Sequence, residues 1–150
     1  MIAVDTNLLV YSHRSDRPNH DAAHQLIEAL RRGSTPWAIP WPCVHEFVSI
    51  VTHARIFKQP TPIVAAFGAV DAWLAGGNLN LIGESEGYLD KLRHQATAAR
   101  LQGPLIHDAR IVALCLHHGV RELWSADRDF NRFTGLAVRN PLVSAAAGTH

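Results

Sequence analysis

Cysteine is scarce in this chain of 150 residues, and a long hydrophobic run is missing. The two cysteines, Cys43 and Cys115, cannot build a disulfide framework, so we expect reduced thiols in a cytoplasmic protein. The longest uninterrupted apolar run, 111–116, is far too short to cross a bilayer, and we expect no membrane partner. The N-terminus has neither a basic start nor a long apolar stretch, which argues against a signal peptide.

An excess of one charge sign is also missing. The 14 basic and 13 acidic residues leave a net charge of +1, which excludes nucleic-acid binding through bulk charge alone. The net charge does not show how the charges are distributed over the surface. If four acids lie together in one pocket, the remaining residues carry a net charge of +5. With 47% hydrophobic and 18% charged residues, the composition is that of a globular protein, and we expect a single domain over 1–150.

Short apolar runs alternate with longer amphipathic segments along the chain, without an internal repeat. The pattern predicts strands over 2–4, 37–39, 79–82, 122–125 and 136–138. It predicts helices over 8–12, 18–32, 42–54, 61–75, 85–101 and 104–118, with Ser85 as a possible N-cap of the fifth. Strands that alternate with helices favour an α/β fold with a parallel sheet, in which functional residues gather at the carboxyl ends of the strands.

Four acids occupy positions of interest in this scheme: Asp5, Glu46, Asp108 and Asp127. Asp5 and Asp127 follow predicted strands, Glu46 lies just beyond the apolar face of its helix, and Asp108 lies near the start of an almost wholly apolar helix. Each has a simpler explanation by itself, as a helix cap, a surface glutamate, a partner of the helix dipole or a turn residue.

Taken together, the four acids indicate a shared site. Four carboxylates brought within a few ångströms cannot all stay ionised without a compensating cation. Such a site is typical of Mg²⁺ or Mn²⁺ binding and of phosphodiester chemistry. The sequence therefore predicts a metal-dependent enzyme.

Four segments in order carry a resemblance to a known family: 2–11 (IAVDTNLLVY), 40–47 (PWPCVHEF), 107–113 (HDARIVA) and 124–130 (WSADRDF). The chain resembles the PIN-domain ribonucleases, most closely the VapC toxins of VapBC toxin–antitoxin modules, and residues 138–142 also look like the end of that domain. The resemblance implies a three-layer α/β fold, with a short parallel sheet flanked by helices on both faces. It also implies a toxin endoribonuclease that blocks translation.

The resemblance also implies roles for individual residues. Asp5, Glu46, Asp108 and Asp127 would be catalytic, with Asp5, Asp108 and Asp127 holding Mg²⁺, or Mn²⁺ in its place. Glu46 would hold a metal-bound water or take its proton. Three further residues would be accessory: Asn7, Ser125 and Asp129.

The partners expected from the resemblance are an RNA substrate, such as a tRNA or rRNA loop, a VapB-type antitoxin and a second copy of the chain. Four arginines are candidates for guiding RNA phosphates near the strand ends: Arg14, Arg17, Arg128 and Arg132. An antitoxin could inhibit by placing an Arg or Lys among the four acids.

Other functions are weighed against this one. A phosphatase that used Asp5 as its nucleophile would require a second acid two residues later, where this chain has Asn7. A non-catalytic module of the same fold would not need the complete set of acids. The ten histidines lack the spacing of a zinc site. For Trp41, packing is favoured over stacking on an RNA base.

Overall fold

The computed structural model describes residues 1–143, and its centre is a five-stranded parallel sheet in the order β3-β2-β1-β4-β5. The strands are β1 (Ile2–Val4), β2 (Trp37–Pro40), β3 (Leu79–Ile82), β4 (Glu122–Trp124) and β5 (Ala137–Arg139). All five lie within about one residue of the predicted segments, because each is a short apolar run bounded by polar or turn residues.

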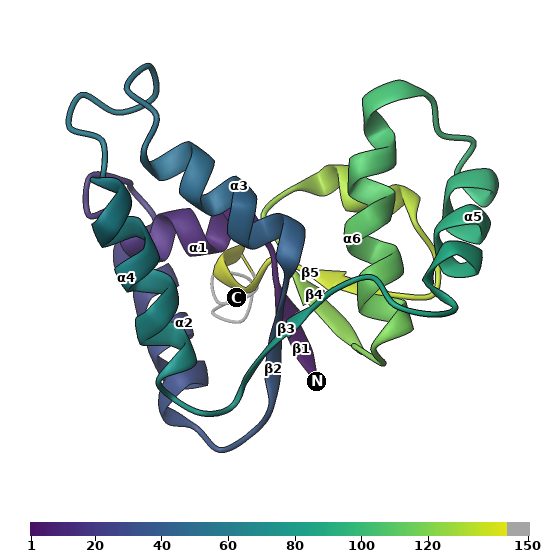
Figure 1. Cartoon of the computed structure of the whole chain (residues 1–150), viewed down its shortest axis with the longest axis horizontal. Coiled ribbons are helices and arrows are strands. Elements are labelled where there is room, and N and C mark those ends of the chain that lie inside the picture. Colours follow the sequence, from purple (N-terminus) through teal and green to yellow (C-terminus); the bar gives the residue numbers. More distant parts are fainter. Residues whose placement is uncertain (144–150) are drawn as a thin grey trace.

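Helices cover both faces of the sheet. They are α1 (Thr6–His13), α2 (His20–Arg32), α3 (Trp41–Val51), α4 (Ile63–Leu74), α5 (Tyr88–Ala98) and α6 (Ile106–His117). In Figure 1, α1 to α4 gather on one side of the strands, and α5 and α6 pack together on the other. The three-layer architecture predicted from the sequence is therefore confirmed. Two short 3-10 helices, Gly103–Leu105 and Arg128–Arg132, complete the described elements.

The core is built around the central strands and one helix. Ala3, Val4 and Trp37 are fully buried in β1 and β2. In α6, buried side chains extend through 111–115, as expected of a helix that is apolar on nearly every side. No helix within residues 1–143 combines the length and apolarity needed to cross a membrane.

Helix ends are where the prediction is least accurate. We expected Ser85 to cap a helix over 85–101, but α5 begins at Tyr88, and its cap is Gly87 with a left-handed backbone (φ 88°). The Ser85 hydroxyl instead lies 2.6 Å from the His117 ring. The predicted helix over 42–54 likewise ends at Val51, where the chain turns toward α4. These ends depend on contacts that local periodicity does not contain.

The topology places the carboxyl ends of all strands at one edge. β1 and β4 are neighbours, with Val4 opposite Trp124, so Asp5 and Ser125 emerge side by side. The backbone N–H of Asp5 donates to the Trp124 carbonyl at 2.9 Å and extends this pairing by one residue. Two helices, α1 and α3, begin directly at the ends of β1 and β2 and carry their first turns over this edge.

Candidate active site

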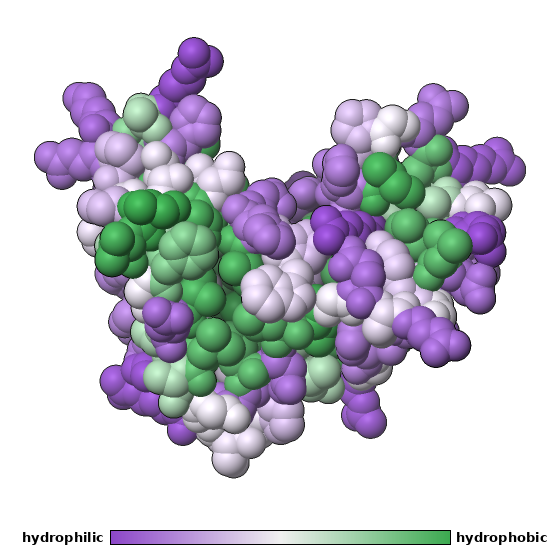
Figure 2. All heavy atoms as spheres, viewed as in Figure 1, coloured by the Kyte–Doolittle hydropathy of each residue, from purple (hydrophilic) through white to green (hydrophobic). Residues whose placement is uncertain are grey.

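A pocket at this edge of the sheet brings the four predicted acids together. It is lined by Asp5, Thr6, Asn7, Glu46, Ile50, Asp108, Ile111, Asp127 and Phe130. The acids come from the ends of β1 and β4 and from α3 and α6, which are far apart in sequence. In the space-filling view, the surface is hollowed between α3 and α6, and hydrophilic residues lie along the hollow (Figure 2).

Asp5 is the most enclosed of the four, with 5% of its surface exposed. Asp5 occupies the N-cap position of α1, as the alternative explanation has it, but its side chain makes no capping hydrogen bond. One carboxylate oxygen accepts from Ser125 Oγ at 2.7 Å, and the other accepts from the Cys43 thiol at 3.5 Å. Burial raises the pKa of the Asp5 carboxyl, while the Ser125 hydrogen bond opposes that rise.

A short hydrogen-bonded chain joins the ends of β1 and β4. Ser125 Oγ, which donates to Asp5, also accepts from the backbone N–H of Asp127 at 3.0 Å. Asn7 Oδ1 accepts from the backbone N–H of Ala126 at 3.2 Å. Asp127 in turn accepts from the Asp129 N–H at 2.8 Å. Asn7, Ser125 and Asp129, predicted as accessory residues, thus contact the segment that carries Asp127.

Glu46 lies on the opposite wall, on α3. The residue is exposed overall, but its carboxylate lines the acid pocket and accepts from Thr6 Oγ1 at 3.3 Å. Partial burial of the carboxylate raises its pKa, and the charge of Asp5 adds to the effect. Thr6 and Cys43 are the contacts that sequence reasoning missed, although both lie within the segments that carry the family resemblance.

Asp108 projects from the first turn of α6 and is partly exposed. Burial raises the pKa of its carboxyl, followed by the charges of Asp127 and Asp5, whereas Arg132 acts in the opposite direction. None of the ion pairs found within residues 1–143 involves one of the four acids. The pocket therefore concentrates negative charge, and no cation of the described side chains forms an ion pair with it.

Carboxylate oxygens are the ligands that Mg²⁺ and Mn²⁺ favour, so the donor chemistry fits such an ion. In the described part of the chain, however, no three Asp, Glu, His or Cys side chains converge closely enough to hold a metal ion directly. Mg²⁺ commonly keeps several waters and binds protein through one or two carboxylates. The pocket thus suits a hydrated ion better than a fully dehydrated one.

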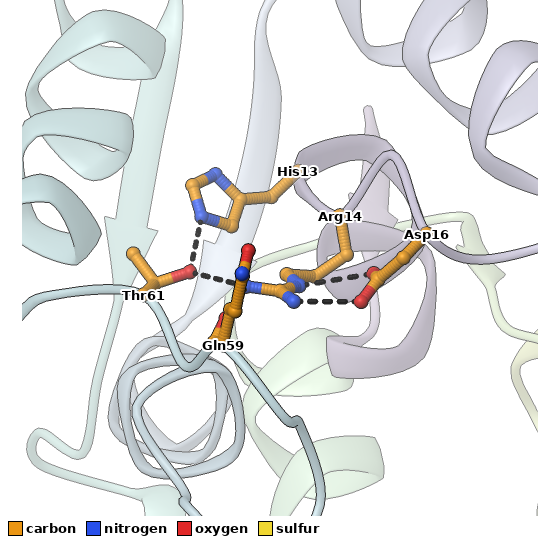
Figure 3. A network of polar contacts seen from close by, with 5 residues as sticks. All are labelled: His13, Arg14, Asp16, Gln59 and Thr61. Carbon is orange, nitrogen blue, oxygen red and sulfur yellow. Dashed lines mark hydrogen bonds and ion pairs between the residues drawn. The ribbon is translucent and has the colours of Figure 1, made fainter.

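Arg14, one of the four candidates for guiding RNA phosphates, is engaged in a network of contacts within the chain (Figure 3). Its guanidinium makes two hydrogen bonds to Asp16, at 3.1 and 2.7 Å, and two more to the Gln59 carbonyl and Thr61 Oγ1, at 2.9 and 3.1 Å. Thr61 also contacts the His13 ring at 3.0 Å. Arg14 therefore fastens the end of α1 to the loop between α3 and α4.

The other three arginines lie in different settings. Arg17 lies over the Phe57 ring at 4.4 Å and lines a second cavity, which shares Asn7 and Ile50 with the acid pocket. Arg128 is exposed at the start of its 3-10 helix. Arg132 is paired with Asp129, at 3.7 Å. That any of the four arginines contacts RNA phosphates stays a prediction.

Known proteins resemble this chain over most of its length. The PIN domain family model matches residues 2–136. Ribonuclease VapC43 of Mycobacterium tuberculosis is 36% identical over 142 residues, covering 95% of this chain and 96% of that protein. Ribonuclease VapC48 of the same species is 31% identical over 137 residues, covering 91% and 94%. The structure of VapBC2 from Rickettsia felis bound to a promoter DNA fragment superposes with a TM-score of 0.67 at 19% identity, covering 93% and 98%, which shows the shared fold.

Proposed function

This chain belongs to the PIN-domain family, and from that membership we propose that it is a metal-dependent endoribonuclease, the toxin of a type II toxin–antitoxin pair. One observation carries the proposal: the acids of four separate segments line a single pocket and form no ion pair with any side chain of residues 1–143. The naming of its full-length relatives as ribonucleases supports RNA as the substrate.

Asp5, Asp108 and Asp127 would hold the metal, Mg²⁺ or Mn²⁺. When bound, such an ion supplies Lewis acidity toward a phosphate and lowers the pKa of a water molecule. Ser125 orients the Asp5 carboxylate and the backbone of Asp127 together. Glu46, whose pKa is raised, is suited to take a proton from the attacking water at its pocket-facing carboxylate, because a base works best when its pKa lies near the working pH.

The phosphatase alternative finds no support in this pocket. An aspartate-nucleophile phosphatase needs a proton donor two residues after its nucleophile. Asn7, which stands there, uses its side-chain oxygen to accept from the Ala126 backbone N–H. The side chain at this position therefore contacts the loop after β4, and an amide has no acidic proton to transfer to a leaving group.

The proposed protein partners are a VapB-type antitoxin and a second copy of the chain. The solved VapBC2 complex supports the first. Apolar side chains exposed on α4 support a protein partner in general, because isolated large apolar groups are common on surfaces but neighbouring ones are less so. These side chains are Ile63, Val64, Phe67 and Leu74. The proposed target remains a structured RNA with an accessible loop, such as tRNA or rRNA.

The decisive experiment compares the purified chain with its Asp127→Asn variant on bulk bacterial RNA. We expect cleavage in Mg²⁺ by the parent chain, a loss of at least about 100-fold in the variant, and an unchanged circular dichroism spectrum. Asp71→Asn, an exposed acid on α4, is the matched control and should cleave normally. Full activity of Asp127→Asn, or cleavage that persists in excess EDTA, would contradict the proposal.

A further inference from the structure

Another cavity, of about 480 Å³ and distinct from the one lined by Arg17, opens between α3 and α6 next to the acid pocket. It shares Glu46, Asp108 and Ile111 with that pocket, so the two are continuous. Its remaining lining is Pro42, His45, Ser49, His107 and Arg110. We call it the α3–α6 cleft; its size is within the range of small-ligand sites, and its lining is rich in hydrogen-bonding groups.

One wall of the cleft is a single face of α3. Trp41, His45 and Ser49 are spaced four residues apart and therefore lie along the same side of the helix. The rings of Trp41 and His45 are tilted against each other, with centroids 6.2 Å apart at 34°. His45 and Ser49 line the cleft, and Trp41 continues the same side of α3 by one turn beyond the lining residues, at the end where α3 begins.

Trp41 is only partly packed, whereas we favoured packing over an open ring. The residue is 42% exposed, unlike Trp37, which is fully buried. The indole lies against Gly83, where an added Cβ would come within 3.0 Å of Trp41 Cδ1. Gly83 thus supports the ring at one edge while leaving much of it open.

Arg110 stands at the same end of the cleft, on α6. Its Nε donates to Glu84, the residue that follows Gly83, so the residues that contact Trp41 and Arg110 are adjacent in sequence. Glu84 orients the guanidinium of Arg110. Among the interactions found in residues 1–143, the contact with Glu84 involves only Nε of that group. A guanidinium carries five N–H donors, so its Nη groups can meet a further acceptor.

We propose that this end of the cleft is a nucleotide subsite of the endoribonuclease, an inference that rests on the proposed function. The base of a nucleotide near the scissile phosphate stacks on Trp41, and a phosphate of the same strand accepts from Arg110. An exposed aromatic ring beside a fixed guanidinium is the combination that binds unpaired RNA, because the ring takes the face of a base and the cation takes the backbone. The substrate strand is therefore single-stranded where it enters the cleft.

The subsite is tested by measuring how tightly labelled RNA binds to a variant that does not cleave it. In the Asp127→Asn background with Mg²⁺, fluorescence anisotropy measures the Kd of a decamer of oligoadenylate. We expect Trp41→Ala to weaken binding about tenfold and Trp41→Phe to retain most of it. Arg110→Ala should weaken binding and reduce the slope of log K against log salt by about one.

Two exposed residues on α5, outside the cleft, provide matched controls: Leu89→Ala and Arg93→Ala. Both should bind like the parent. The subsite is overturned if Trp41→Ala and Arg110→Ala also do so, or if a duplex of the same length binds as tightly as the single strand. Loss of antitoxin binding with unchanged RNA binding would overturn it too, by making the cleft a protein-docking surface.

Cleavage by the chain with an intact Asp127 is measured alongside. If the chain cleaves RNA but Trp41→Ala and Arg110→Ala bind RNA as tightly as the controls, the subsite is wrong and the nuclease proposal stands. Absence of cleavage in Mg²⁺ would contradict the nuclease proposal, and the substrate subsite, which rests on it, would fall with it. The two failures therefore give different results.

Discussion

At the scale of single residues, the Ser125 hydroxyl connects two of the four acids by hydrogen bonds. It is buried, donates to Asp5 and accepts from the Asp127 backbone, so one oxygen couples two acids on neighbouring strands. The Ser125 hydrogen bond stabilises the ionised form of Asp5, against the burial that raises its pKa.

Ser125→Ala should therefore shift the pH dependence of RNA cleavage. Without the hydroxyl, the pKa of Asp5 rises further, so the acidic limb of the pH–rate profile moves to higher pH. The unpaired Asp127 N–H should also lower stability by about 1–2 kcal/mol, measured by urea unfolding. Ser15→Ala, at an exposed position, is the control. An unmoved acidic limb would show that Ser125 does not set the ionisation of the site.

The raised pKa values of Asp5, Glu46 and Asp108 also have a consequence for stability. In each, the folded protein holds its proton to a higher pH than the unfolded chain does. The folded state is therefore favoured below the unfolded pKa, near 4, and this contribution is lost as pH rises through the raised folded pKa.

Asp108→Asn removes one of these charges and should stabilise the metal-free protein at pH 7 but not at pH 4. Because Asp108 is partly exposed, water screens its interactions, and we expect a gain of at most about 1 kcal/mol. For a domain of this size that is about 2–4 °C in the thermal midpoint. The measurement is thermal unfolding in EDTA at both pH values; an equal effect at both would contradict the electrostatic explanation.

At the scale of elements, the ends of α2 and α4 meet at one close backbone contact. A Cβ on Gly76, just after α4, would lie 2.5 Å from the Arg31 carbonyl oxygen in the last turn of α2. Only glycine allows this approach without a backbone shift. Gly68, within α4, has open space around it instead.

These two glycines form a matched pair for mutagenesis. Gly76→Ala should destabilise the protein by about 1–3 kcal/mol, because the backbone must move to accept the methyl group. Gly68→Ala should stabilise it by up to about 1 kcal/mol, since alanine is the better helix former and meets no clash. Chemical denaturation of both variants measures the difference. Equal effects of the two substitutions would show that the contact of Gly76 with Arg31 is not restrictive.

At the scale of the whole molecule, a nearly neutral chain concentrates four acids in one pocket. The remaining described surface is correspondingly more basic, and the pocket favours any cation that can enter it. The proposed metal and the proposed antitoxin side chain would both do so, which makes them competitors.

Two measurements test that competition. Mg²⁺ should raise the thermal midpoint, by about 5–10 °C at 100 times its Kd, because it binds only the folded state. Inhibition by the antitoxin should weaken as Mg²⁺ is raised. Inhibition that is indifferent to Mg²⁺ would show that the antitoxin blocks RNA access away from the acids. A midpoint unchanged by Mg²⁺ would show that the pocket does not bind the ion.

The strands, most of each helix and the four acids were predictable from the sequence. Their signals are local: an apolar run of strand length, a helical period, or an acid directly after a strand. Parallel strands end at one edge, so the α/β class predicted Asp5 and Asp127 at the same edge of the sheet. That β1 and β4 are neighbours there was decided by the strand order. The order of the four resembling segments then placed Glu46 and Asp108 at the same pocket.

The tertiary structure alone decided which polar side chains are already engaged. The sequence offers Arg14 as a candidate for RNA phosphates, and only the structure shows that its guanidinium makes hydrogen bonds to Asp16, Gln59 and Thr61. Trp37 and Trp41 are the same residue type, four positions apart. Trp37 is fully buried, whereas Trp41 packs against Gly83 beside the α3–α6 cleft and is partly exposed. Hydrogen bonding and exposure depend on residues that are distant in sequence, and one-dimensional periodicity carries no record of those contacts.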